Sequence, residues 1–210
     1  MAKFKARARA LDLLGRQQIA GIPTAINELF KNAHDAYADY VEVDYFRKES
    51  LFILRDDGLG MTKEDFEMRW LTLGTESKFS NHKTPSPPKH PNKPERPIMG
   101  EKGIGRLAIA SIGRQLLVMT KADRENESHN LVVAFINWGI FELPGLNLDD
   151  VVIPLYEFED GKIPDADDID FMKEEVIESL EELVKKNDIT KEEGEFLIKE
   201  IKGFSVNPKS

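Results

Sequence analysis

The sequence has 210 residues, of which 29 are Lys or Arg and 38 are Asp or Glu; the net charge is −9 and hydrophobic residues make up 40%. A chain of this length and composition buries a real core, as one large domain or two small ones, which excludes wholesale disorder. It contains no cysteine, which excludes disulfides and thiolate metal sites.

Charge and apolar runs limit the partners and the location of the chain. No apolar run approaches the roughly 20 residues that cross a bilayer, so we expect no membrane partner. The basic start of the sequence lacks the apolar core of a secretory signal, and we expect a cytoplasmic protein. Basic residues gather in 3–9 and 78–102, whereas the sequence from Asp149 onward is acidic. Such blocks usually form solvated faces, and the acidic total leaves nucleic-acid binding possible but unsupported.

The first part of the sequence predicts a helix, two strands and a short second helix. Gly21 and Pro23 mark the start of a helix with recurring apolar positions. The alternating stretch 40–46 and the more apolar stretch 50–56 predict two strands. A short helix is expected over 63–70, after a glycine-containing break.

The second part begins with a stretch rich in proline and lysine, 80–97, which predicts a mobile loop because it cannot bury enough apolar surface to order itself. The later elements are expected as a helix at 107–112, strands at 115–121, 130–143 and 151–158, and helices at 171–186 and 191–201. This order of elements predicts one α+β domain with helices layered on one face of a sheet.

Glu28, Asn32 and Asp35 form a polar stripe on the first long helix, because their spacing is i, i+4 and i+7. The stripe lies beside the apolar face, where a carboxylate and an amide need partners that a ligand can supply. The same spacing is typical of an ordinary polar flank. Both interpretations stay open for this motif by itself.

Two segments that contain glycine are further candidates for ligand contact. In DDGLGMT, Asp56 ends a strand, and Gly58 and Gly60 let the backbone approach a flat ligand closely. In MGEKGIGRLA, the glycines precede an apolar helical run, so the loop can turn successive N–H groups toward an anion. The alternatives are a tight β-turn for the first segment and a turn that only starts a helix for the second.

The order and separation of four segments favour the ligand-binding interpretation. ELFKNAHDA, DDGLGMT, LGTESK and GEKGIGRLA resemble the successive nucleotide-binding motifs of the GHKL superfamily, which includes gyrase B, heat-shock chaperone ATPases, MutL, MORC proteins and histidine kinases. The resemblance runs from about residue 22 to residue 121. It implies the Bergerat fold, a two-layer α/β sandwich with a mixed, mostly antiparallel sheet, and the binding of ATP or ADP with Mg²⁺.

The resemblance also implies a role for each matching residue. Glu28 looks like the general base that activates the attacking water, and Asn32 looks like the side-chain ligand of Mg²⁺. Asp56 resembles the carboxylate that accepts a hydrogen bond from the adenine amino group. The other residues implied to contact the cofactor are Asp35 on the helix, Gly58, Gly60 and Met61 at the purine, and Lys102, Gly103, Ile104, Gly105 and Arg106 at the phosphates.

The matching residues favour an ATP hydrolase within this superfamily. Glu28 and the pair Asp35–Ala36 separate the chain from histidine kinases, whose equivalent helix usually lacks the hydrolytic glutamate. We therefore expect Mg²⁺-dependent hydrolysis of ATP to ADP and phosphate, slow in the isolated domain, which drives lid closure and dimerisation. Two alternatives stay open: a non-hydrolysing module that senses ATP, and a DNA-associated repair or defence ATPase resembling MutL or MORC proteins.

The resemblance divides the chain into three expected regions. A basic strap covers 1–20, an ATP-binding domain with a lid at about 71–105 covers 21–160, and an acidic helical extension covers 161–210. The extension is either separate or the C-terminal part of the same domain. The strap either crosses to a second copy in a nucleotide-dependent homodimer or packs on its own domain.

Two features depart from the pattern of the superfamily. No clear Gly-Thr pair follows Thr75, and Thr120 is the substitute we consider for the residue that closes the adenine pocket. We also find no counterpart of the transducer domain, which often supplies a lysine to the γ-phosphate. Either the chain is a fragment, or the acidic helices replace those parts. We expect a fragment, or a domain whose other domains or protein partner are missing.

Overall fold

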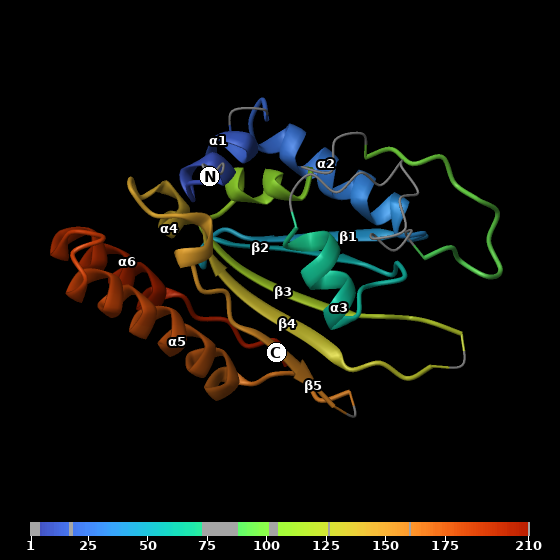
Figure 1. Cartoon of the computed structure of the whole chain (residues 1–210). Coiled ribbons are helices and arrows are strands. Elements are labelled where there is room, and N and C mark those ends of the chain that lie inside the picture. The colour runs from blue at the N-terminus through green and yellow to red at the C-terminus, as the bar shows by residue number, and fades with distance from the viewer. Residues whose placement is uncertain are drawn as a thin grey trace.

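The computed structural model describes residues 5–16, 19–72, 88–100, 105–125, 127–159 and 161–209. Its elements are, in chain order, α1 (Arg9–Arg16), α2 (Ile22–Asp35), β1 (Val41–Phe46), β2 (Leu51–Asp56), α3 (Lys63–Asp65), η1 (Phe66–Trp70), η2 (Gly105–Ser111), β3 (Gln115–Lys121), β4 (Leu131–Asn137), α4 (Trp138–Glu142), η3 (Leu148–Asp150), β5 (Leu155–Phe158), α5 (Ala166–Lys185) and α6 (Lys191–Gly203). In Figure 1, α1 and α2 lie above the strands, and α5 and α6 lie at the lower left, on the other side of β4 from α2. No helix within these ranges is long and apolar enough to cross a membrane.

Helix α2 begins where its glycine and proline predict. Gly21 has a φ of 94°, a conformation that favours glycine, and Pro23 lies in the first turn, where its missing N–H leaves no bond unmade. The buried residues of α2 are Ala25 and Ala33, and this small-residue face lies against η2. Phe30, which the apolar pattern places on the same face, is 41% exposed. Small side chains therefore allow α2 and η2 to approach closely.

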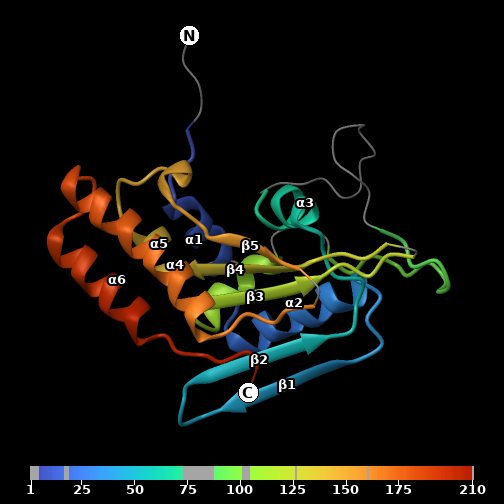
Figure 2. The ribbon, with the colours of Figure 1, turned by 90° about the horizontal axis from the view of Figure 1, so that it is seen from below.

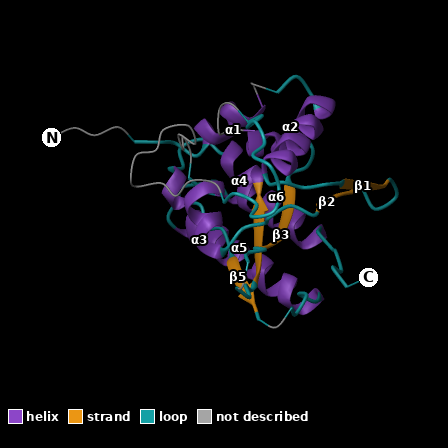
Figure 3. Cartoon of the chain, turned by 90° about the vertical axis from the view of Figure 1, so that its right-hand side faces the viewer, coloured by secondary structure: helices purple, strands orange, loops and turns teal. Residues whose placement is uncertain are grey.

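The strands form two antiparallel sheets. β1 pairs with β2 in a hairpin that sets Val41 opposite Asp56, and β4 pairs with β3 on one side and β5 on the other. Figures 2 and 3 show the hairpin extending along one side of the molecule. Every strand pair in the described residues is antiparallel. The predicted α+β class is confirmed.

Strand β4 is buried on both of its faces. Val133 and Phe135 join the larger core together with residues of α5 and α6. Val132 and Ala134 point the other way and pack with Phe66 of η1. The apolar stripes of the C-terminal helices thus pack on the side of β4 that carries Val133 and Phe135.

The strand predicted over 130–143 is too long at its C-terminal end. β4 ends at Asn137, whose side chain accepts a hydrogen bond from the N–H of Gly139 at 2.7 Å and so caps α4. The apolar run continues through this helix, and an apolar run alone does not distinguish a buried strand from a buried helix. β5 is likewise shorter than predicted and begins after Pro154, which has no N–H to donate to a sheet.

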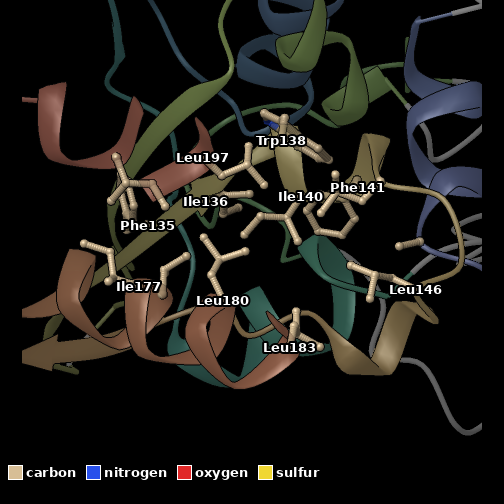
Figure 4. Close-up of a cluster of buried hydrophobic side chains, with 14 of the residues drawn as sticks. Phe135, Ile136, Trp138, Ile140, Phe141, Leu146, Ile177, Leu180, Leu183 and Leu197 are labelled. Atoms are coloured by element: carbon tan, nitrogen blue, oxygen red, sulfur yellow. The ribbon is translucent and has the colours of Figure 1, made fainter. Parts of the chain in front are cut away.

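The two C-terminal helices are held by capping boxes and by the larger core. α5 begins five residues earlier than predicted, behind Asp165, and α6 begins behind the predicted cap Thr190. Figure 4 shows Leu180 of α5 and Leu197 of α6 pointing toward Ile140 and its neighbours. Both leucines are at most 1% exposed. The extension therefore packs into the same core as β4 and α4.

The segment before α2 contacts its own chain. Ala8 is fully buried, and its N–H donates to the carbonyl of Leu146 at 3.0 Å. Arg7 also donates to the carbonyl of Gly145. Leu11 of α1 is buried, whereas the next leucines, Leu13 and Leu14, are 39% and 37% exposed. The described part of the predicted strap, 5–16 and 19–20, thus includes a helix packed against η2 and α4.

Candidate nucleotide site

The polar stripe of α2 meets the start of η2. A Cβ built on Gly105 would lie 2.9 Å from Oε2 of Glu28 and 3.7 Å from Oδ1 of Asn32. The carboxylate of Glu28 is the end of a flexible side chain, and the first distance shows that it lies directly against the backbone of Gly105. Two of the four predicted motifs, more than seventy positions apart in sequence, therefore lie next to each other.

Glu28 stands at this junction with a cationic neighbour. Nζ of Lys31 donates to Oε1 of Glu28 at 2.6 Å, and the two side chains are 29% and 24% exposed. Oε2 is the oxygen that faces Gly105. One carboxylate oxygen is thus occupied by the lysine, while the other points toward the glycine segment.

Asp35 has a different environment from the other two residues of its stripe. Its carboxylate oxygens accept hydrogen bonds from the N–H groups of Met99 and Gly100 at 2.8 and 2.9 Å. Nδ1 of His34 lies 3.3 Å from Oδ1 of Asp35. Asp35 therefore anchors the segment that enters the glycine motif. Its predicted contact with a ligand stays a prediction.

The described end of the predicted lid, 88–100, is fixed to the C-terminal end of α2. Nζ of Lys93 donates to Oδ2 of Asp39 at 2.7 Å, and Arg96 donates to the carbonyl of Ala38 at 2.7 Å and to Asp39 at 3.1 Å. Lys93, the largest cause, and Arg96 together hold the pKa of the Asp39 carboxyl below its ordinary value. Lys93 and Arg96 thus form their ion pairs with a carboxylate of the same chain.

The loop after β2 is folded tightly onto the end of α2. The N–H of Gly58 donates to Oδ1 of Asp56 at 3.0 Å, and the N–H of Leu59 donates to the carbonyl of Ala36 at 2.7 Å. A Cβ on Gly58 would lie 2.9 Å from the Cβ of Ala36. Asp56 remains exposed at the end of β2. Oδ1 of Asp56 is thus used within the turn, and the predicted contact of Asp56 with a ligand stays a prediction.

The same loop meets strand β3 at Gly60. This glycine has a φ of 55°, and a Cβ on it would lie only 2.0 Å from the carbonyl oxygen of Lys121. The next residue, Met61, donates its N–H to Oγ1 of Thr120 at 3.0 Å. Thr120, the substitute considered from the sequence, thus lies beside the predicted purine loop.

Arg106 has a side-chain role that its motif does not indicate. Its Nε donates to the carbonyl of Trp70 at 2.6 Å, and Nη2 donates to the carbonyl of Thr72 at 2.5 Å. Burial lowers the pKa of its guanidinium. Arg106 therefore ties η2 to the end of η1, where the predicted lid begins. Lys102, Gly103 and Ile104 lie outside the described residues, as do 73–87 of the lid.

Helix α2 connects the two ends of the candidate site. Glu28 and Asn32 face the glycine segment, and Ala36 supports the loop of Asp56. Eight residues of helix separate Glu28 from Ala36, a rise of about 12 Å. One rigid helix therefore sets the spacing between the two ends of the candidate site.

Comparison with known proteins agrees with this geometry. The family described as "Histidine kinase-, DNA gyrase B-, and HSP90-like ATPase" matches residues 21–144. The chain belongs to this ATPase family. The predicted resemblance to the GHKL superfamily is thereby confirmed, and the matched range contains the polar stripe, the loop of Asp56, the glycine motif and β3.

Two curated relatives are similar to this chain over only a small part of their own length. The "ATPase morc-1" of Caenorhabditis elegans is 34% identical over 103 residues, which are 48% of this chain and 10% of the relative. The "Putative type II restriction enzyme HgiDII" of Herpetosiphon aurantiacus is 34% identical over 85 residues, which are 40% of this chain and 12% of the relative. The similarity therefore concerns a domain of much longer proteins.

Proposed function

We propose that the chain binds ATP and, with Mg²⁺, hydrolyses it to ADP and phosphate. Membership in the ATPase family supports ATP binding in general. The observation that carries the finer proposal is the meeting of Glu28 and Asn32 with Gly105, at 2.9 and 3.7 Å from a Cβ built there. A carboxylate that can act as a general base and an amide oxygen lie beside the glycine segment. This arrangement fits ATP hydrolysis, which depends mainly on positioning the reactants and neutralising charge.

Glu28 is the proposed general base. Its free oxygen faces the glycine segment, so it could accept a proton from a water held between the helix and the terminal phosphate. Lys31 fixes the other oxygen and thereby the direction of the carboxylate. We propose Glu28, and not Asp35, as the general base, because both carboxylate oxygens of Asp35 accept hydrogen bonds from backbone N–H groups.

Asn32 suits the proposed Mg²⁺. Mg²⁺ takes oxygen ligands, keeps several of its waters and binds substrate phosphates, so one amide oxygen from the protein is a sufficient donor. Oδ1 of Asn32 faces Gly105, and Asn32 is exposed. When bound, the ion would neutralise charge on the phosphates. Within the described residues no group of three or more His, Asp or Glu offers a different metal site.

The purine is proposed to bind at Asp56, Gly58, Gly60 and Met61, with Thr120 closing the pocket. Asp56 is an acceptor for an amino group, which adenine carries and guanine replaces with a carbonyl. The phosphates are proposed to contact the N–H groups of the remaining predicted residues: Gly103, Ile104, Gly105 and Arg106, with Lys102 and Asp35 nearby. The buried contacts of Gly58 and Gly60 support this loop as a preformed surface.

Phosphate release and ATP binding, measured in parallel, test the proposal. Glu28→Gln should lower kcat by about 100-fold or more, as expected for loss of a general base, while Kd for ATP changes little. Glu42→Gln, at an exposed carboxylate on β1, is the matched control and should leave both quantities unchanged. Asp56→Asn should weaken ATP binding about tenfold, because an amide N–H then faces the adenine amino group. Failure of the wild type to bind ATP would refute the proposal.

The conformational part of the proposal concerns the predicted lid and a second copy of the chain. Nucleotide would close the lid over the site and bring two copies together. The exposed Leu13 and Leu14 on α1 support an apolar contact between copies. Molar mass measured by light scattering, with and without a non-hydrolysable ATP analogue, should rise only with the analogue. A further protein partner, or the rest of a longer chain, is proposed to respond to that change.

Two alternatives to the proposed function can be tested by the same measurements. A module that binds ATP without hydrolysing it would show retained binding and no turnover in either wild type or Glu28→Gln. A DNA-associated ATPase is suggested by the relative named as a restriction enzyme. Against it, Lys93 and Arg96 pair with Asp39, and Lys89 pairs with Glu95. An increase of ATP turnover on addition of duplex DNA would favour it. Any of these functions fits the cytoplasmic location that we propose from the absence of cysteine.

A further inference from the structure

Arg124, in the turn after β3, contacts the loop that follows β2 at three points. Its Nη1 donates to the carbonyl of Leu59 at 2.6 Å, and its Nη2 donates to the carbonyl of Gly60 at 3.3 Å. Nη2 also donates to Oδ2 of Asp65 at 2.9 Å. One guanidinium therefore holds two consecutive carbonyls and a carboxylate from a segment 59–65 residues away in sequence.

The carboxylate that orients Arg124 is itself fixed. Oδ2 of Asp65 accepts a hydrogen bond from the N–H of Thr62 in a capping box, and Oδ1 lies 3.4 Å from Nη1 of Arg69. The side chains of Arg124 and Asp65 are 19% and 17% exposed. Because water screens such a pair only partly, these contacts are stronger than those of an exposed ion pair.

The carbonyls held by Arg124 belong to an unusual stretch of backbone. Gly60 is in the left-handed region with a φ of 55°, and the turn brings it against the carbonyl of Lys121. The carbonyl of Leu59 accepts a second bond, from the N–H of Asp123 at 2.9 Å. Without the guanidinium, the carbonyl of Gly60 and the carboxylate of Asp65 would each lose a donor, and other loop conformations would compete.

We infer that Arg124 is a positioning residue for base recognition: it holds the loop of Gly60 and Met61 in the form that receives the purine, without touching the nucleotide. The inference rests on the proposed function. It predicts that loss of Arg124 lowers the fraction of molecules competent to bind, and the observed Kd rises by the inverse of that fraction. ADP and an ATP analogue should lose affinity equally, because both carry the same base.

Calorimetric titration of the folded variants with ADP and with a non-hydrolysable ATP analogue tests the inference. Arg124→Gln removes the charge-assisted bonds and should weaken both ligands about tenfold. Arg124→Lys keeps the charge but cannot reach all three acceptors, and should lie between wild type and Arg124→Gln. Arg55→Gln is the matched control, since Arg55 pairs with Asp44 and Glu42 on the hairpin and its guanidinium donates to no carbonyl within the described part of the chain. In steady-state turnover, Arg124→Gln should raise KM for ATP while kcat stays within about twofold.

The outcomes distinguish this inference from the proposed function. If wild type binds neither ligand, the proposed function fails. If wild type binds both and Arg124→Gln binds them equally well, the inference is overturned. Weakening of the ATP analogue alone, or a fall in kcat at unchanged KM, also overturns it, because either result assigns Arg124 to the phosphate end. If Arg124→Gln does not fold, the same comparison with Arg124→Lys decides.

Discussion

The two helical layers of this molecule are packed by different kinds of side chain. The layer of α1, α2 and η2 buries many small residues: Ala8, Ala25, Ala33, Ala108 and Ala110. The layer of α5 and α6 meets β4 through large ones, such as Phe135, Leu180 and Leu197. Small side chains allow backbones to approach, which the candidate site requires. Large side chains remove more apolar surface from water, and so stabilise the fold more per residue.

The difference suggests that the two layers have different roles: one forms the candidate site, and the other stabilises the fold. The candidate site lies where glycines and alanines bring α2, η2 and the loop after β2 together. Stability is expected to come mainly from the other layer, whose helices are long and properly capped. Substitutions in the layer of α5 and α6 should therefore change stability without changing ligand affinity, whereas substitutions at the candidate site should change ligand affinity with a smaller loss of stability.

The strongest test of this division is Phe135→Ala. Phe135 is fully buried in the larger core and lies 5.3 Å, between ring centroids, from Phe204. Its truncation should lower the free energy of unfolding by about 3–5 kcal/mol. Chemical denaturation measures this change. Leu14→Ala, at a leucine 37% exposed, is the control and should change stability far less. An equal loss in both variants would contradict the assignment of stability to the C-terminal layer.

Gly60→Ala should affect both stability and ligand binding. Alanine at a φ of 55° is strained, and its Cβ would meet the carbonyl of Lys121 at 2.0 Å. We expect a loss of about 1–3 kcal/mol in the free energy of unfolding, together with loss of detectable nucleotide binding. Gly145→Ala has a comparable φ of 91° but open space around its Cβ, and should keep its affinity. Normal binding by Gly60→Ala would show that the loop is not preformed.

Asp35→Asn should weaken the anchoring of the glycine segment at a small cost in the stability of the fold. The carboxylate accepts N–H groups of Met99 and Gly100, and an amide offers only one acceptor oxygen. We expect a loss of about 1 kcal/mol in the free energy of unfolding and severalfold weaker nucleotide binding. Denaturation and calorimetric titration measure the two effects. Asp44→Asn on the hairpin serves as the control, and identical affinities in the two variants would assign Asp35 to packing alone.

The smallest expected effect is a pH dependence of the C-terminal layer. Tyr156 donates to Oε1 of Glu175 at 2.6 Å, and this bond raises the pKa of Tyr156 from 10.0 to about 12. The pKa of Tyr156 is higher in the folded state than in the unfolded state. The hydrogen bond therefore contributes fully to the free energy of unfolding below pH 10, and this contribution is lost as the pH rises from 10 toward 12. Tyrosinate absorbance should show one late-titrating tyrosine. The pKa of Tyr156 should fall in Glu175→Gln. An unchanged pKa would show that this hydrogen bond does not stabilise the protonated tyrosine.

The sequence by itself determined the elements whose signals are local. Pro23 and a helical period predicted α2, and Thr190 with Glu193 predicted the start of α6, since caps and periodicity depend on near neighbours. The resemblance of four motifs predicts the family, because it depends on residue types and spacing and not on contacts. The end of β4 at Asn137 was not predicted, because an apolar run fits a buried strand and a buried helix equally well.

Only the tertiary structure decided how distant side chains are used. Asp35 shares a stripe with Glu28, yet it turns toward backbone N–H groups 64 and 65 positions away. Arg106 stands in a phosphate motif, but its side chain reaches carbonyls 34 and 36 positions earlier. Arg124 lies in the turn after β3, outside all four motifs of the resemblance. A hydrogen bond between distant residues leaves no periodic or compositional signal, because its geometry is set by how the layers pack.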